Sequence, residues 1–493
     1  MHPASKTSSS PSSMTRRQAL ATALAGATAW AQDASGAHQA TGLKTGEITP
    51  SSAVIWARHT VAPVRFNEGI VRKGHVPIGK PLRPDETVDA FEGACPGAPG
   101  YVRLRLEPLT GRRQERLTPW VEVGPETDFT HQFRVADLTP ATPYRFVVET
   151  KASQQGKTAD GLGGQFRTAP GPSDSAPVTF ALSSCQMYCR MDRPGGFAIY
   201  DAIRLLDPAF LASCGDNVYY DSEDPVVTSI APARYHWHRM YSLPTLRAAL
   251  LRVPGYWQKD DHDGLTNDYW PGIEKYPTKP FSLEEGKRIF REQVPAPEQP
   301  TTYRRFRWGK ALEVWFTEAR DFRAPNNEPD GPNKSLWGQE QKQWLKQTLL
   351  ESDASWKIVI NPNPIVGPDH IEKNDNHANP GFATEGLEFR RWVHETLRGQ
   401  VIVMNGDRHW QYHSVDPESG LHEFGCGPAS DEHAIAPSSG HNPKYHRFLN
   451  VKGGFLVVTV DPSQASQLVV EHRDITGKTV YRHAYTEKDR VHA

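Results

Sequence analysis

The sequence predicts an α/β core preceded by an N-terminal antiparallel β-sandwich. Between Gly46 and about Ala169, short runs of β-forming residues alternate with turn signals, which is typical of an antiparallel sandwich. Beyond that point apolar strands alternate with helical stretches, a pattern that favours a sheet buried on both faces. The 39 glycines and 41 prolines among 493 residues exceed the ordinary combined share of about 12% and argue against a helical bundle.

The N-terminal part divides at three boundaries. Residues 32–47 are small and polar, and we expect an unstructured tail there. Residues 48–170 form the predicted sandwich, of immunoglobulin or fibronectin III-like class, and residues 171–177 form a linker rich in Pro, Gly and Ser. The strands expected in the sandwich are 53–57, 133–135, 144–148 and 165–168.

The second part, residues 178–493, is the predicted catalytic domain. Its apolar strands are expected at 178–182, 210–212, 357–360 and 401–404. Its helices are expected near 197–207, 282–292, 337–350 and 385–397. Residues 454–484 return to a β pattern, which predicts a further sheet or sheet edge.

Charge and cysteine content exclude several classes of protein. The 56 basic and 57 acidic residues give a net charge of -1, which argues against binding to nucleic acid. Five cysteines are too few for a disulfide scaffold in a chain of this length. Because the number is odd, at least one cysteine is a free thiol or a metal ligand.

The N-terminus predicts export. Arg16 and Arg17 directly precede the uncharged apolar run 19–31, which ends in the small-x-small site Ala29-Trp30-Ala31. This pattern resembles a twin-arginine signal over 1–31 and implies the twin-arginine machinery as partner and a periplasmic or secreted location. A Sec signal with two incidental arginines is the alternative. No run approaches the 18 apolar residues of a transmembrane helix, so none is expected.

Residues that bind metals gather directly after the predicted strands. Strand ends of an open α/β sheet meet at one edge, where ligands bind. Several carboxylates at that edge would repel one another without cations between them, so the pattern predicts a site for more than one metal ion. The segments are Ser183–Cys185, Gly215–Tyr219, Asp260–Asp268 and Gly406–His409.

Each of these segments is weaker evidence than the set. A Gly-Asp pair after a strand is often only a turn, and a single cysteine is often an apolar filler. The acids at 260–263 are costly to bury unless paired or metal-bound, and the alternative is a solvated loop. His409 lies two residues after Asp407, so both side chains point to one side of an extended segment.

The order of these motifs resembles the alkaline phosphatase D family of metallophosphatases over about 178–435. The resemblance implies a metallophosphatase-type αββα sandwich, with Ala53–Ala57 and Leu138–Val148 similar to the family's N-terminal β-sandwich. The matching motifs are Ser184-Cys185-Gln186, Gly-Asp-x-x-Tyr at 215–219, Asp-Asp-His-Asp-x-x-x-Asn-Asp at 260–268, Arg-x-x-Arg at 320–323 and Gly-Asp-x-His at 406–409.

The resemblance also implies roles for single residues. Ferric iron (Fe3+) would be bound by Cys185, Asp216, Tyr219 and His409. Asp216 would bridge to a harder cation, Ca2+ or another divalent metal, with Asp261 and Asp407 as further ligands. His262 is similar to the family's proton donor, and Arg320 to a contact with phosphate or with the metal loop. Asp260, Asn267 and Asp268 are expected nearby.

The chain departs from the family pattern at two positions. Glu318 stands where the family usually has Asp, which predicts altered support for the ligands. Lys259 stands where an aromatic residue is common, which predicts a different pocket wall. No further ligand between 360 and 400 is identified from the sequence; the candidates are Asn361, Asn363, His370 and His377.

The expected function is metal-dependent hydrolysis of a small phosphate mono- or diester by a metal-activated water, of alkaline phosphatase or phosphodiesterase type. One alternative is a phospholipase D-like phosphodiesterase, since the same site can cleave diesters. A more distant alternative is a periplasmic binding protein with a degenerate metal site. The metal-binding residue types present in every motif argue against that last class.

Overall fold

The structure is a computed structural model that describes residues 37–72, 79–111, 114–299, 301–464, 466–486 and 489. The predicted export signal at 1–31 lies outside these residues. Within the part described, no helix has the length and apolar character needed to cross a bilayer.

The described strands form three sheets, which we name A, B and C. Sheet A has the order β21 (Thr479–Thr486), β20 (Ser466–Arg473), β19 (Phe455–Val460), β9 (Val178–Ser183), β10 (Phe210–Cys214), β11 (Gly255–Gln258), β1 (Leu43–Gly46), β2 (Ala53–Arg58) and β6 (Thr130–Val135). Sheet B has the order β12 (Arg304–Trp308), β13 (Leu312–Phe316), β14 (Trp356–Asn361), β15 (Val401–Asn405), β17 (His422–Cys426), β16 (Gln411–Val415) and β18 (His446–Asn450).

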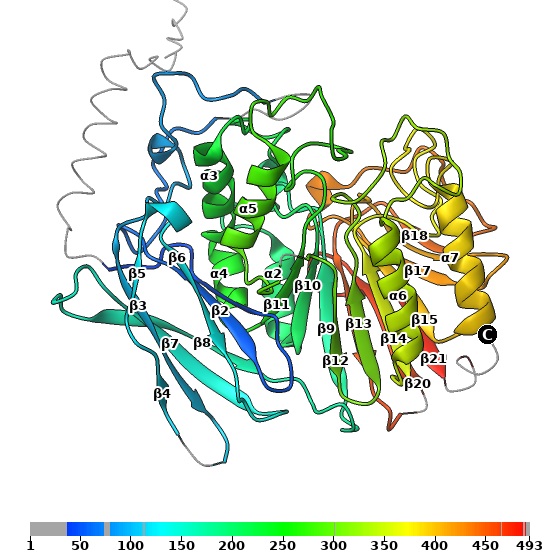
Figure 1. Cartoon of the computed structure of the whole chain (residues 1–493), viewed down its shortest axis with the longest axis horizontal. Coiled ribbons are helices and arrows are strands. Elements are labelled where there is room, and N and C mark those ends of the chain that lie inside the picture. Colours follow the sequence, from blue (N-terminus) through cyan, green and yellow to red (C-terminus); the bar gives the residue numbers. More distant parts are fainter. Residues whose placement is uncertain are drawn as a thin grey trace, which may run out of the picture.

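Sheets A and B pack face to face, as the side chains of their central strands show. Successive residues of a strand point to opposite faces. In β9, Phe180 belongs to the apolar core between the sheets, and Ala181 belongs to the core under the first helices. In β13, Val314 faces the core between the sheets and Trp315 faces the last helices. Both sheets are therefore buried on two faces, and the layers are helix, sheet, sheet and helix (Figure 1).

Helices cover the outer faces of both sheets. Those on sheet A are α2 (Ala198–Leu206), α3 (Ile230–Tyr241), α4 (Pro244–Leu250) and α5 (Leu283–Gln293). Those on sheet B are α6 (Gln339–Glu351) and α7 (Ala383–Thr396). The sequence predicted α2, α5, α6 and α7 but missed α3 and α4. In α3, nine of the twelve residues are buried, so the usual polar face is absent.

The N-terminal strands form a sandwich that shares a sheet with the core. Sheet C contains β4 (Arg116–Leu117), β3 (Gly100–Pro108), β7 (Pro143–Lys151) and β8 (Ala159–Arg167), with β5 (Val121–Val123) paired to β3. Its buried side chains, such as Leu104, belong to the same apolar core as Ile55 and Phe133 of sheet A. The expected antiparallel sheet is present, while the immunoglobulin or fibronectin III-like class and the domain boundary at 170 stay predictions.

The expectation of an unstructured tail over 32–47 is wrong for its described part. Strand β1 pairs with β2 along its whole length and meets β11 at Gly46, which joins the N-terminal strands to the core sheet. Lys44, buried in β1, donates from Nζ to the Gln293 carbonyl at 2.7 Å and lies 3.6 Å from the Trp56 ring centroid. The sequence did not predict this strand, because its polar residues lack the usual β pattern and its strand partners lie far away in the sequence.

Candidate metal centre

The candidate ligands follow the ends of parallel strands, as the sequence predicted. Cys185, Asp216 and Asp407 lie two residues beyond β9, β10 and β15. All three have left-handed backbone, with φ of 55°, 53° and 59°, which is uncommon for residues other than glycine. Backbone strain of this kind concentrates at functional sites, where it aims side chains.

Two glycines allow the strand-end loops to approach each other closely. A Cβ at Gly215 would lie 2.5 Å from the Asp260 Cβ, and one at Gly406 would collide with the Ser184 Oγ. Any larger residue would push these loops apart. The Gly-Asp pairs are therefore more than turns, because Gly215 lets two loops of sheet A approach each other and Gly406 lets a loop of sheet B approach one of sheet A.

The first group of ligand types is Cys185, Asp216 and His409, whose ligand atoms lie within 4.8 Å of one another. The Cys185 Sγ lies 3.5 Å from the Asp216 Oδ2, and the Tyr219 hydroxyl donates to the same oxygen at 3.0 Å. The structure thus brings together thiol, carboxyl, phenol and imidazole from four separate motif positions.

The second group consists of carboxylates around Asp261. The carboxylates of Asp260, Asp261 and Asp407 lie within 4.8 Å of one another. Asp261 also lies within that distance of Asp216 and His262. Because Asp216 belongs to the first group as well, its carboxylate lies between the mixed sulfur–nitrogen group and the oxygen group.

A third group contains an acid that the sequence did not identify. The ligand atoms of Asp375, Asp261 and Asp268 lie within 4.8 Å of one another. Asp375 is therefore the candidate ligand that the 360–400 segment supplies. Asn361 instead accepts hydrogen bonds from Thr317 and Trp337, and His377 pairs with Glu385 at 3.0 Å. An Asp within a polar loop carries no periodic signal, so Asp375 could be found only from its position in space.

The other two candidates from that segment lie outside the three groups. Asn363 donates to the Asp375 carbonyl at 2.7 Å, which holds the loop that carries this acid. His370 bonds Ser438 at 3.1 Å and packs edge-on against Trp410. Asn267 is exposed, and its backbone N–H donates to Asp221 at 2.7 Å.

Buried carboxylates without partners indicate that cations fit this site. Among the described residues, neither the Asp216 Oδ1 nor the Asp260 Oδ2 has a hydrogen-bond partner. Burial, and then the charge of Asp261, raise the pKa of Asp216 well above its usual range. An uncompensated buried carboxylate is costly, and a bound cation is the ordinary compensation. The donor set offers sulfur and nitrogen on one side and oxygen on the other.

Arg320 contacts acids of the second and third groups. Its fully buried guanidinium bonds Asp260 through Nε and Asp375 through Nη1, the latter at 3.0 Å. Its Nη2 lies 3.5 Å from Asp261 and 3.7 Å from Asp407. Arg320 therefore contacts candidate metal ligands, and the two roles expected for it, contact with phosphate or with the metal loop, stay predictions.

A second buried arginine, Arg408, was not predicted. It contacts Asp407 through Nη2 and lies 3.3 Å from Asp369 through Nη1. Arg408 lies inside the Gly-Asp-x-His motif at the variable position, where the sequence alone gives it no role. Together with Arg320 it supplies fixed positive charge that limits repulsion among the acids.

His262 is held by an acid that the sequence also missed. The His262 Nδ1 lies 2.7 Å from the Asp221 Oδ1, and Asp221 further accepts from the Thr266 hydroxyl at 3.0 Å. Burial disfavours the charged imidazole, but Asp221, Asp261 and Asp216 outweigh it and raise the pKa of His262 well above its usual range. Its ring lies 4.4 Å from that of Tyr219, beside the first group.

His433 lies beside the first group. Its ring centroid lies 3.9 Å from that of His409, and its Nδ1 lies 3.1 Å from the Cys185 carbonyl oxygen. Burial lowers the pKa of His433 to about 4, so the imidazole is neutral at neutral pH. It lies in a short helical turn far along the chain, where a lone histidine gives no signal in the sequence.

The two departures from the family pattern contact each other. Lys259 Nζ lies 3.2 Å from the Glu318 Oε1 and 2.9 Å from the Asp321 Oδ1, and Lys259 is 1% exposed. Glu318 in turn accepts from the Arg320 backbone N–H at 2.7 Å. The ion pair between Lys259 and Glu318 therefore supports the loop that carries Arg320. The Lys259 side chain is buried in the protein interior.

All five cysteines are free thiols, and each lies in the described part of the chain. Cys185 is buried, while Cys189 is exposed and bonds Glu223 through its backbone N–H at 2.8 Å. Neighbouring groups partly desolvate its thiol, and this effect, followed by the charge of Glu223, raises the pKa of Cys189 to about 12, so the thiol is protonated at neutral pH.

Comparison with known proteins finds phosphatases that are similar to this chain. A family model described as PhoD-like phosphatase matches residues 180–452. Alkaline phosphatase D of Bacillus subtilis (strain 168) is 24% identical over 490 residues, covering 86% of this chain and 76% of that protein.

Solved structures show the same fold. A structure of PhoD superposes with a TM-score of 0.67 at 19% identity, covering 91% of this chain and 88% of that one. The purple acid phosphatase PPD1 from yellow lupin (Lupinus luteus) seeds gives a TM-score of 0.60 at 13% identity, covering 92% and 75%. Since the family model matches more than half of the sequence, the chain is a phosphatase-type hydrolase that belongs to the PhoD-like phosphatase family.

Proposed function

We propose that the protein hydrolyses phosphate esters at the metal centre formed by the strand-end loops of sheets A and B. The observation that carries this proposal is the shared position of Asp216 between two groups of ligand types. A carboxylate in that position can bind two cations at once, and two-cation sites suit the displacement of an oxygen leaving group from phosphorus.

The chemistry of the donors supports iron on one side and calcium on the other. Thiolate, phenolate and imidazole from Cys185, Tyr219 and His409 suit iron. On the second side the candidate ligands Asp216, Asp261 and Asp407 all offer carboxylate oxygens, which suit a hard cation such as Ca2+. Asp216 would bridge the two ions, with Asp261 and Asp407 as oxygen ligands and Asp268 and Asp375 close by.

The residues of the chain have separate tasks in this reaction. Bound cations would withdraw charge from the phosphate oxygens and supply hydroxide at neutral pH. Arg320 and Arg408 hold the carboxylates in place from the buried side. His262 keeps its Nδ1 on Asp221, so its Nε2 is the nitrogen that gives a proton to the departing oxygen. No covalent phosphoenzyme is needed.

The direct test combines metal analysis with turnover. The purified protein is analysed for elements and assayed with nitrophenyl phosphate and with bis-nitrophenyl phosphate. We expect iron and calcium in stoichiometric amounts and activity that a chelator removes. A metal-free protein that still turns over either ester contradicts the proposal, and the ratio of the two rates decides between monoesterase and phospholipase D-like diesterase.

Tyr219→Phe should bleach or shift the visible colour of the iron-loaded enzyme. A phenolate bound to ferric iron gives a charge-transfer band, and the substitution removes only that oxygen. Burial, and then Asp216 and Cys185, raise the pKa of Tyr219 well above its usual range, so a phenolate there needs a cation. The measurement is the visible spectrum per mole of iron.

Tyr220→Phe is the matched control for this experiment. Tyr220 is the next residue, is equally buried, and accepts from Trp237 Nε1 at 2.7 Å outside the ligand groups. Its variant should keep the spectrum of the parent enzyme. An unchanged band in Tyr219→Phe with iron still bound would remove tyrosine from the ligand set.

We further propose that residues 1–31 export the folded protein through the twin-arginine machinery to the periplasm or medium. Replacing Arg16 and Arg17 together with lysine should hold phosphatase activity in the cytoplasmic fraction. A Sec signal needs only positive charge before its apolar run and would tolerate the change. Lys6→Gln is the control, and continued export of the double-lysine variant would contradict the twin-arginine route.

A further inference from the structure

Three histidines come together away from the metal centre. His413 lies on β16, His422 begins β17 and His483 lies on β21, and their ligand atoms are within 4.8 Å of one another. His422 pairs with Ile402 near the beginning of β15, whereas the metal centre follows the end of that strand. The group therefore lies toward the opposite end of sheet B.

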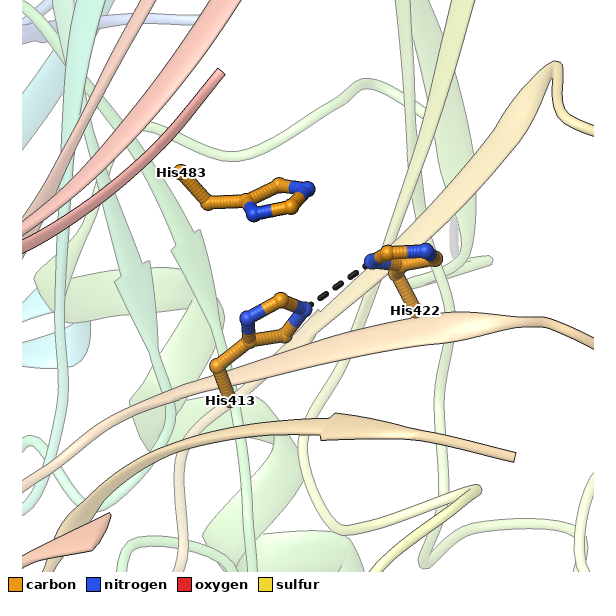
Figure 2. A group of neighbouring side chains, drawn as sticks. All are labelled: His413, His422 and His483. Atoms are coloured by element: carbon orange, nitrogen blue, oxygen red, sulfur yellow. Dashed lines mark hydrogen bonds between the residues drawn. The ribbon is translucent and has the colours of Figure 1, made fainter. Parts of the chain in front are cut away.

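The three rings face a common space, as Figure 2 shows. The His413 Nε2 lies 2.9 Å from the His422 Nδ1, and the ring of His483 lies 4.8 Å and 5.3 Å from those two rings. Two nitrogens bound to one tetrahedral ion at about 2.0–2.1 Å stand about 3.3 Å apart. A shift of a few tenths of an ångström would thus let an ion replace the hydrogen bond between the rings.

A hydrogen bond to a neighbouring tyrosine orients the His413 ring so that one of its nitrogens can bind an ion. The Tyr481 hydroxyl lies 2.9 Å from its Nδ1, which can fix the ring and leave Nε2 for an ion. Contacts of this kind orient histidines in metal sites. Burial, followed by His483, lowers the pKa of His422 to about 4, so this imidazole is neutral and able to bind a cation at neutral pH.

A cavity of about 340 Å³ adjoins the group. His422 and His483 line it together with Tyr485 and Asp489. Within the described residues the buried Tyr485 hydroxyl has no hydrogen-bond partner. The cavity gives an ion access and room for a water as fourth ligand, and the Asp489 carboxylate offsets part of the ion's charge.

Packing alone does not account for three imidazoles here. His413 stacks on Phe424 at 4.1 Å, a contact that a phenylalanine would make equally well. Burying polar rings costs free energy unless each nitrogen has a partner. The bonds to Tyr481 and His422 already satisfy both nitrogens of His413, and an ion shared by the three rings would take the place of the bond to His422.

We propose that His413, His422 and His483 form a second metal site, separate from the catalytic centre, for a borderline divalent ion such as Zn2+. Imidazole is a preferred ligand of such ions, and the absence of carboxylates among the three ligands disfavours Ca2+. His413 and His422 belong to sheet B, and His483 belongs to β21, the edge strand of sheet A. The ion ties the two sheets together and stabilises the folded protein.

The test titrates Zn2+ into the metal-loaded enzyme, with calorimetry for stoichiometry and thermal unfolding for stability. We expect one Zn2+ equivalent and a rise in unfolding temperature. His422→Gln and His483→Gln should each weaken this binding by at least about 100-fold and remove the rise in unfolding temperature. Without added Zn2+ both variants should keep the parent's unfolding temperature and turnover.

His394→Gln is the matched control, because His394 lines the same cavity but bonds the Ser419 carbonyl at 2.9 Å outside the triad. Its variant should bind Zn2+ like the parent. Co2+ gives a second readout, since it shows visible absorption when bound by three imidazoles. Zn2+ affinity that is equal in the parent, His422→Gln and His483→Gln, or absent from all of them, overturns the proposal.

Discussion

We expect Asp216→Asn to abolish phosphatase turnover and to lower the metal content of the purified protein. Asn cannot supply two anionic oxygens, so the position shared by the two ligand groups is lost. Metal ions contribute several kcal/mol to stabilising the transition state in such sites, which corresponds to a fall in kcat of about 10³-fold or more. The measurements are kcat with nitrophenyl phosphate and elemental analysis of the same preparation.

The fold should survive this substitution. The pKa of Asp216 is raised by burial and by Asp261, so its ionised form destabilises the metal-free protein at pH values above its usual pKa. Metal-free Asp216→Asn should therefore unfold at a temperature no lower than that of the metal-free parent. Asn also tolerates the left-handed backbone at this position.

Asp207→Asn provides the matched control, because Asp207 is exposed and has the same left-handed backbone, with φ of 51°. Its variant should keep full activity and metal content. Near-normal activity and metal occupancy in Asp216→Asn would contradict the bridging role.

His262→Ala should lower kcat for alkyl phosphates by about 10²- to 10⁴-fold and far less for nitrophenyl phosphate. An alkoxide needs a proton as it departs, whereas nitrophenolate is already a stable anion. The measurement is the dependence of kcat on the pKa of the leaving group. Equal losses on both substrates would assign His262 to binding instead of proton transfer.

Asp221→Asn tests how His262 keeps its proton. The Asp221 carboxylate stabilises the imidazolium at 2.7 Å, and Asn removes that charge while it can still bond the ring. The pKa of His262 should fall, and the alkaline limb of the rate profile for alkyl phosphates should move to lower pH. Asp263→Asn is the control: Asp263 is also a buried acid, lies next to His262 in the chain, and accepts from the Asn217 backbone N–H at 2.9 Å. Its variant should leave the limb in place.

The sequence predicted where the strands lie in the chain better than it predicted which strands pair with each other. Apolar runs such as 178–182 and 401–404 lie within the strands observed, because a strand buried on both faces needs continuous apolar residues. It did not reveal that β1, in the supposed tail, pairs with β2 and β11. Short polar strands depend on distant partners, and those exist only once the chain has folded.

The same division applies to the site. Cys185, Asp216 and Asp407 were visible in the sequence because each follows a strand end, and strand ends converge. Asp375, Asp221 and His433 were not visible, because each is an ordinary polar residue in a loop until folding places it beside a ligand.

The sequence by itself determined the layered α/β architecture and the chemical types that meet at the strand ends. Both follow from local patterns, namely hydrophobic period and the residues directly after a strand. Only the tertiary structure decided which basic side chain forms an ion pair with which acidic side chain. In the sequence, Lys259 and Glu318 are two separate departures from the family pattern. In the structure they form one buried ion pair at 3.2 Å, and Glu318 also accepts from the Arg320 backbone N–H. Charge pairing acts through space over a few ångströms, and these two residues lie 59 positions apart in the chain.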